Sequence, residues 1–124
     1  MSRWIVDGMN VIGSRPTGWW RDRPGAMSAL VESLGELAER SGDEVTVVFD
    51  GGPLELEEPD RVEVVFASRR GRDAADDDIA ALVEADRDPE RLSVVSSDGD
   101  LARRVRAAGA TVVGAGEFRR RLDG

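Results

Sequence analysis

The chain has 124 residues, a formal net charge of −8 and no cysteine, histidine or tyrosine, and all 17 of its basic residues are arginines. These absences exclude disulfides, serine–histidine triads, cysteine nucleophiles, zinc bound by histidine or cysteine, and lysine Schiff bases. Carboxylates therefore remain as the acid–base or metal-binding groups, and the acidic balance argues against holding nucleic acid by bulk positive charge.

We expect one compact domain over residues 1–124, because this length allows one sizeable hydrophobic core but not two. No apolar run approaches the roughly 20 residues that span a bilayer, so we predict a soluble protein with no membrane partner. The N-terminal stretch MSRWIVDG lacks the charged and long apolar regions of a secretory signal, which predicts a cytoplasmic location.

Short β-branched runs alternate with longer segments of helical spacing, which is typical of βαβ units. In chain order, the pattern predicts a strand over 3–6, a helix over 24–40, strands over 44–49 and 62–67, a helix over 75–85, a strand over 92–96, a helix over 99–108, a strand over 111–113 and a helix over 117–122. Residues 14–23 and 51–60 are rich in turn formers and are expected to be loops. We predict an α/β fold in three layers, with about five parallel strands and the first strand at the centre.

Aspartates stand at the ends of three predicted strands, at Asp7, Asp50 and Asp98. The carboxyl ends of parallel strands lie along one edge of a sheet, where open α/β sheets bind their ligands. We therefore expect these three carboxylates to converge. Any one of them alone can equally be explained as a cap for the turn that follows it.

A further acidic run opens the second predicted helix, which follows the third strand and so starts at the same edge. On its helical face Asp76 is followed by Ile79, Ala80 and Val83, which predicts that Asp76 turns inward. Asp77 and Asp78 are expected to turn partly toward solvent, where they favour the helix dipole.

Several carboxylates packed together repel one another, so such a cluster needs a compensating cation. Mg²⁺ or Mn²⁺ is the expected cofactor, because hard divalent ions prefer oxygen ligands and suit phosphate chemistry. Asn10 adds a neutral oxygen and amide donors close to Asp7, and it can orient a ligand without adding charge. The sequence therefore predicts a metal site at this edge of the sheet.

Four motifs in this order resemble the NYN branch of the PIN-like nucleases, and especially its YacP-like group, over nearly the whole chain. They are DGMN at 7–10, FDG at 49–51, ADDDI at 75–79 and SSDGDL at 96–101. The resemblance implies a small Rossmann-like PIN fold and endoribonuclease activity that depends on Mg²⁺ or Mn²⁺. For the YacP-like group it also implies association with ribosomes and translated mRNA.

Carried over by position, the resemblance implies that Asp7, Asp76 and Asp98 hold one or two metal ions. Asn10, Asp50 and Asp100 are expected to support this site. Either Asp76 or Asp77 matches the acid that the family carries at the helix start. In the expected reaction water attacks the phosphorus, and a carboxylate such as Asp98 or Asp100 takes its proton.

Two further groups are expected to contact the substrate. Arg69, Arg70 and Arg72 directly precede the acidic helix start, where guanidinium groups can grip phosphates, although they can equally pair with the neighbouring aspartates. Trp19 and Trp20 can stack on unpaired bases, or alternatively pack their loop against the domain. Stacking would favour single-stranded RNA.

Other functions fit the sequence less well. A HAD-type phosphatase needs an acidic residue at position 9, which is Met9, and it also needs a lysine. A dinucleotide-binding domain needs the spacing G-x-G-x-x-G, which DGMNVIG lacks. We predict a divalent-metal-dependent endoribonuclease acting on single-stranded RNA. The alternative is a catalytically inactive PIN-like module that binds RNA or ribosomes, and in either case the helix faces leave room for a homodimer.

Overall fold

The computed structural model describes residues 2–51, 53–68 and 74–123 of the chain. Within these ranges the strands are β1 (Arg3–Asp7), β2 (Glu44–Phe49), β3 (Val62–Phe66), β4 (Leu92–Val95) and β5 (Thr111–Val113). The α helices are α1 (Gly8–Gly13), α2 (Arg23–Ser41), α3 (Ala74–Ala85), α4 (Gly99–Ala107) and α5 (Ala115–Asp123). Two short 3₁₀ helices, η1 (Trp19–Arg21) and η2 (Pro89–Arg91), complete the elements of the described residues.

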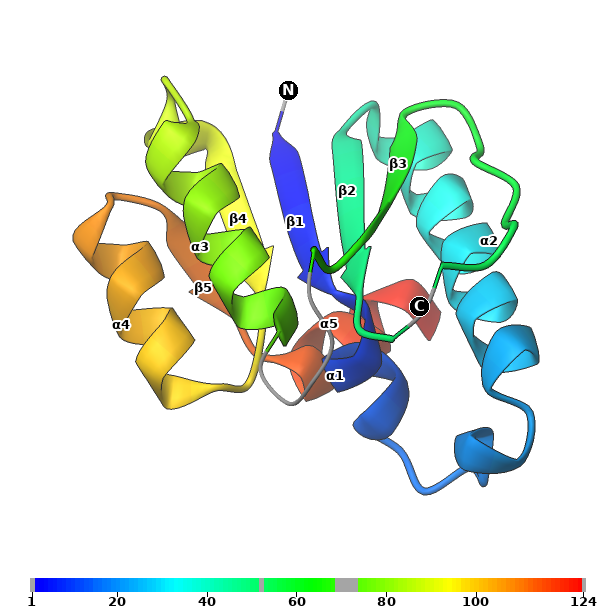
Figure 1. Ribbon diagram of the computed structural model, residues 1–124. Coiled ribbons are helices and arrows are strands. Elements are labelled where there is room, and N and C mark those ends of the chain that lie inside the picture. The colour runs from blue at the N-terminus through cyan, green and yellow to red at the C-terminus, as the bar shows by residue number, and fades with distance from the viewer. Residues whose placement is uncertain (1, 52, 69–73, 124) are drawn as a thin grey trace.

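All strand pairs of the sheet are parallel, and their order is β3-β2-β1-β4-β5. β1 pairs with both β2 and β4, so it lies at the centre of the sheet. Parallel neighbours need crossover connections. Helices α1 and α2 lie between β1 and β2, and α4 lies between β4 and β5, whereas the described residues between β2 and β3 form no helix (Figure 1). The arrangement confirms the predicted α/β fold and the central first strand.

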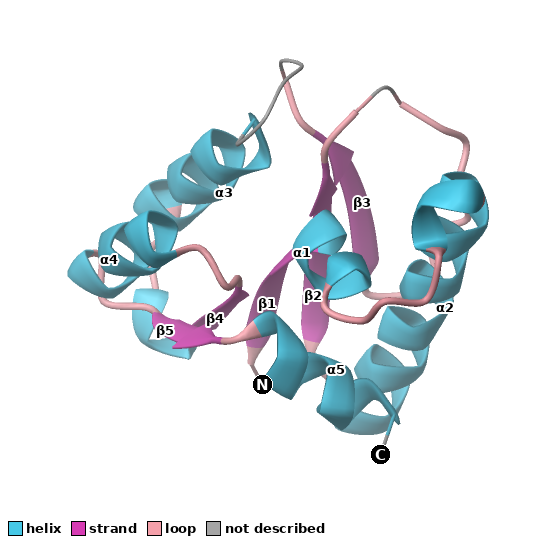
Figure 2. Ribbon diagram, turned by 90° about the horizontal axis from the view of Figure 1, so that it is seen from below, coloured by secondary structure: helices cyan, strands magenta, loops and turns pink. Residues whose placement is uncertain are grey.

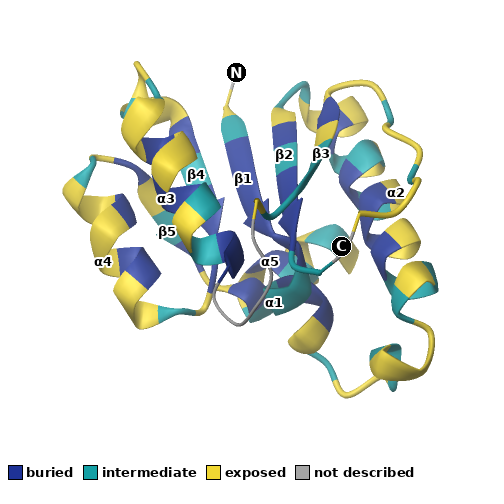
Figure 3. Ribbon diagram, viewed as in Figure 1, coloured by how far each residue is buried: buried dark blue, intermediate teal, exposed yellow. Residues whose placement is uncertain are grey.

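Helices cover both faces of the sheet, with α3 and α4 on one side and α2 and α5 on the other (Figure 2). Successive side chains of β1 enter opposite cores, as the alternation of a strand requires. Trp4 and Val6 pack in the core on the α2 and α5 side, whereas Ile5 packs in the core on the α3 and α4 side. The buried residues therefore line the strands and the inward helix faces (Figure 3).

The sequence pattern did not predict the short helix α1. The predicted strand ends at Val6 and no element is predicted for the residues directly after it, but the chain turns into a helix directly after Asp7. The Asp7 carboxylate caps this helix by accepting the backbone N–H of Asn10. Val11 and Ile12 are apolar because they are buried against the core, and not because they extend a strand.

Smaller differences concern loops and element ends. The loop expected over 14–23 contains the 3₁₀ helix η1, and α2 begins at its last residue, Arg23. The last helix begins at Ala115, two residues earlier than the periodicity predicted. Within the described part of the chain, no helix is both long and apolar enough to cross a membrane.

Candidate active site at the carboxyl edge of the sheet

Asp7 is the buried charged residue at the centre of the carboxyl edge. It ends β1, and its register places it on the same face as Ile5, toward α3. Its exposed fraction is 3%, and its Oδ1 accepts the Asn10 N–H at 3.3 Å. The fold therefore holds a carboxylate with little access to water where a strand becomes a helix.

Burial raises the pKa of Asp7 from 3.8 to about 7, because loss of water disfavours the charged form. The hydrogen bond from the Asn10 backbone opposes this shift. The negative charges of Asp76, Asp50 and Asp98 raise the pKa further. Carboxylates that follow β2, open α3 and precede α4 thus act together on one buried acid.

Asp50 directly follows β2 and connects it to the start of α3. Its Oδ1 accepts the backbone N–H of Ala75 at 2.8 Å, which satisfies one of the free amides at the beginning of that helix. Its backbone carbonyl accepts a hydrogen bond from the Arg23 guanidinium at the start of α2. Asp50 therefore fixes the ends of three elements around the acidic edge.

The acidic run of α3 separates into three orientations. Asp76 is half-buried, and its charge acts on Asp7. Asp77 is exposed and lies 3.7 Å from the Arg104 guanidinium of α4. Asp78 accepts hydrogen bonds from the backbone N–H and the hydroxyl of Ser68, at 2.6 and 2.9 Å. The structure thus brings Asp76 to the buried acid and places Asp77 beside an arginine.

Asp98 is the N-cap of α4. Its Oδ1 accepts the backbone N–H of Leu101 at 2.8 Å, and its own N–H donates to the buried Ser96 hydroxyl at 3.1 Å. Asp100, in the first turn of the same helix, is exposed and forms an ion pair with Arg103. Of these two acids, Asp98 is the one whose charge acts on Asp7.

Asn10 joins α1 to the loop before α4. Its side-chain oxygen accepts the backbone N–H of Ser97 at 2.8 Å, across 87 positions of sequence. The Ser97 hydroxyl in turn accepts the N–H of Ala115, the first residue of α5, at 3.1 Å. Ser96 and Ser97 were not predicted as site residues, although they begin the motif SSDGDL that contains Asp98.

The donor set of this edge fits a hard divalent cation. All the carboxylates and the amide of this edge offer oxygen atoms, and among the described residues the charges that act on the buried Asp7 carboxylate are all negative. Within the described ranges, however, no three acidic side chains lie close enough together to hold a metal ion as they stand. Binding would therefore require the carboxylates to draw together.

The two tryptophans differ in environment. Trp19 is half-buried and packs against the core, while Trp20 is 59% exposed. Their rings meet edge to face, with centroids 6.1 Å apart and an angle of 82° between the planes. The structure therefore shows Trp19 packing the loop and Trp20 presented to solvent. The predicted phosphate clamp, Arg69, Arg70 and Arg72, lies outside the described residues.

The parallel sheet with helices on both faces and aspartates gathered at its carboxyl edge matches the arrangement of a PIN-like, nuclease-type domain. The family model of the YacP-like NYN domain matches residues 4–124, and the chain belongs to this family. The resemblance carried by the four acidic motifs is thereby confirmed. No curated protein matches the chain significantly.

The fold is also found among solved structures, and those similar to this chain include two of the same protein. Both are crystal structures of Rae1 (YacP) from Bacillus subtilis, one of them a tryptophan-to-leucine mutant. The chain is 27% identical to each, with TM-scores of 0.82 for the mutant and 0.81 for the other structure. The match covers 99% of this chain in both cases, and 76% and 74% of the Rae1 chains respectively.

Proposed function

We propose that this protein is a divalent-metal-dependent endoribonuclease that hydrolyses phosphodiester bonds of single-stranded RNA. The observation that supports this most is the gathering of three carboxylates around the buried Asp7, whose pKa is raised to about 7. Membership of the YacP-like NYN family supports the nuclease class. A purely structural role does not explain why like charges surround a buried acid, because this arrangement costs stability.

In this proposal Asp7, Asp76 and Asp98 hold Mg²⁺ or Mn²⁺, and Asp50 supports them from the end of β2. The chemistry that such an ion supplies when bound is neutralisation of the phosphodiester charge and acidification of a water molecule. The ion would also lower the pKa of Asp7, because an adjacent positive charge favours the ionised carboxylate. Metal binding and ionisation of Asp7 are therefore coupled.

The chain's own polar atoms suit the remaining steps. One oxygen of Asp98 is used as the helix cap, while its Oδ2 makes no hydrogen bond with the described residues and can accept a proton from the attacking water. The Asn10 oxygen is held by Ser97, so its side-chain NH₂ is left to donate to a phosphate oxygen. Both roles use atoms that the fold has already oriented.

Single-stranded RNA is the proposed substrate because Trp20, in the 3₁₀ helix η1 that precedes α2, offers an exposed aromatic face. Base stacking on such a ring is worth about 1 to 3 kcal/mol and requires an unpaired base. Trp19 supports Trp20 from behind through their edge-to-face contact. The proposal extends to mRNA on ribosomes, which the family resemblance implies, and to a cytoplasmic setting, which the N-terminal sequence predicts.

The proposed function is tested by incubating the wild-type protein with a mixture of labelled single-stranded RNA and DNA, with and without Mn²⁺. We expect internal cleavage of RNA that requires Mn²⁺ and is lost in Asp7→Asn. This substitution preserves the side-chain shape and an oxygen that can still cap α1. Loss of cleavage in a folded Asp7→Asn protein would therefore reflect the carboxylate.

Two other outcomes would contradict the proposal. Equal cleavage by wild type and Asp7→Asn would place the chemistry elsewhere or reveal a contaminating nuclease. Intact RNA under every condition, together with measurable RNA binding, would instead favour the catalytically inactive module. A Mn²⁺ titration by calorimetry separates these cases, because only the enzyme requires a metal site.

A further inference from the structure

Arg23 lies at the start of α2, where the chain reaches the end of β2. Its guanidinium donates a hydrogen bond to the backbone carbonyl of Asp50 and rests against the Gly51 backbone. A Cβ at Gly51 would lie 2.6 Å from Nη2 and 2.7 Å from Nη1, so only glycine permits this packing. Because Asp50 acts on Asp7, the Arg23 guanidinium borders the acidic site.

The hydrogen-bonding capacity of this guanidinium is mostly unused. Arginine carries five N–H donors, yet the described residues provide Arg23 with one acceptor, the Asp50 carbonyl. Its Nε is buried and has no acceptor among the described residues, and no ion pair joins Arg23 to a described carboxylate. A half-buried cation with spare donors thus lies at the turn that follows β2, in contact with the backbone of Asp50.

We propose that Arg23 binds a backbone phosphate of the RNA substrate at the β2 side of the acidic site. The inference rests on the proposed function, and it names a substrate-binding residue. A site built from carboxylates repels a polyanion, so a fixed cation at its border is needed to bring the RNA backbone near. Guanidinium groups match phosphate oxygens with paired donors, and Arg23 is already immobilised by Asp50.

A purely structural role is the alternative explanation, with Arg23 serving only to anchor the turn at Asp50 and Gly51. Arg40 provides a matched comparison, because it is on the same helix and also donates to a backbone carbonyl, that of Arg121, at 3.1 Å. Arg40 lies at the opposite end of α2, away from the acidic edge. The two arginines therefore differ in location and share the kind of bond they make.

The test measures binding of a labelled single-stranded RNA by fluorescence anisotropy in a chelating buffer, over a range of salt concentrations. All proteins carry Asp7→Asn, so cleavage plays no part in the result. Adding Arg23→Gln should weaken binding about 10-fold and make the slope of log affinity against log salt shallower by about 0.7, the value for one phosphate contact. Adding Arg40→Gln should leave both quantities unchanged.

Equal affinity and equal salt slope for Arg23→Gln and its parent would overturn the inference, even if cleavage by the wild-type protein were demonstrated. Absence of RNA binding by the parent would overturn it as well. If Arg23→Gln does not fold, Arg23→Lys decides the matter, since lysine keeps the charge but loses the paired donors. Weaker binding with an unchanged salt slope then supports the inference, and unchanged binding refutes it.

Discussion

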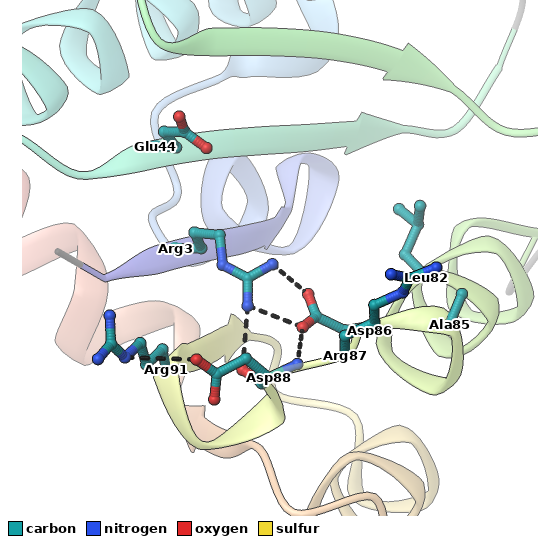
Figure 4. A pocket seen from close by; sticks show the side chains of 8 residues that line it. All are labelled: Arg3, Glu44, Leu82, Ala85, Asp86, Arg87, Asp88 and Arg91. Carbon is teal, nitrogen blue, oxygen red and sulfur yellow. Dashed lines mark hydrogen bonds and ion pairs between the residues drawn. The ribbon is translucent and has the colours of Figure 1, made fainter.

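The two edges of the sheet use aspartate in opposite ways. At the amino edge, the Asp86 carboxylate receives two hydrogen bonds from Arg3, at 2.5 and 2.7 Å, beside a cavity of about 580 Å³ (Figure 4). These bonds lower the pKa of Asp86. At the carboxyl edge, Asp7 is buried among like charges and its pKa is raised to about 7.

This difference separates a stabilising carboxylate from one that costs stability. Asp86 connects the end of α3 to the first residue of β1, and its ionised form is favoured in the folded protein. The ionised form of Asp7 is disfavoured in the folded protein, so ionisation of Asp7 as the pH rises to neutral and above destabilises the fold. Groups arranged against stability are characteristic of functional sites, which points to the carboxyl edge as the place of chemistry.

The largest expected effect is on catalysis. Asp7→Asn should reduce RNA cleavage in Mn²⁺ by more than about 100-fold, because even residues behind metal ligands contribute roughly 10- to 100-fold. Asp86→Asn, at the opposite edge, should keep cleavage within about twofold when the protein is folded. Initial rates on a fluorescent single-stranded RNA measure both variants. Equal losses in the two would remove the functional difference between the edges.

The second effect is on stability in chelating buffer. The rise in the pKa of Asp7 from 3.8 to about 7 corresponds to a loss of at most about 4 kcal/mol in the free energy of unfolding. The folded protein holds the Asp7 proton more tightly than the unfolded chain does. The free energy of unfolding should therefore fall as the pH rises from about 3.8 to about 7. Asp7→Asn should remove that fall and be more stable than wild type at about pH 8. Urea denaturation at several pH values measures the free energy of unfolding of both proteins. A wild-type free energy that does not fall with rising pH would contradict the raised pKa.

The third effect has the opposite sign. Asp86→Asn should lower the free energy of unfolding by about 1 to 3 kcal/mol, because Arg3 loses a charged partner. Since the pKa of Asp86 is lowered in the folded state, its contribution is present at neutral pH and is lost as pH falls through the carboxylate range. The same denaturation series detects this, and a variant as stable as wild type would show that the pair contributes nothing.

The smallest effect concerns the exposed aromatic ring near the carboxyl edge. Trp20→Ala should weaken single-stranded RNA binding by about fivefold, the lower end of base stacking on an aromatic side chain. Leu82→Ala is the matched control, because Leu82 is an exposed apolar residue that lines the cavity of the amino edge. Anisotropy in the Asp7→Asn background should show no change for Leu82→Ala. An equal loss in both variants would indicate general destabilisation.

Much of the fold could be predicted from the sequence because its signals are local. The β-branched runs and the helical spacing of apolar residues gave the strands and the main helices, and the parallel topology then implied that the strand-end aspartates share an edge. The helix α1 was missed because Val11 and Ile12 look the same whether they continue a strand or are buried in a short helix.

The supporting contacts of the site could not be predicted in the same way. The bond between Arg23 and the Asp50 carbonyl spans 27 positions, and that between Asn10 and Ser97 spans 87. Neither has a periodic signature, because a single guanidinium or amide reaches a backbone group that the tertiary fold brings near. Likewise, the three acids of α3 are adjacent in sequence, and only packing against α4 directs Asp77 to Arg104.

The central claim is that the carboxyl-edge aspartates form one coupled anionic site that takes up a divalent cation. NMR titration of the Asp7 side-chain carboxyl carbon tests it most directly, in metal-free buffer and again with millimolar Mg²⁺. We predict a midpoint near the raised pKa of about 7 without metal and a clear downward shift when Mg²⁺ is added. A midpoint close to the ordinary value of 3.8, unmoved by Mg²⁺, would contradict the account.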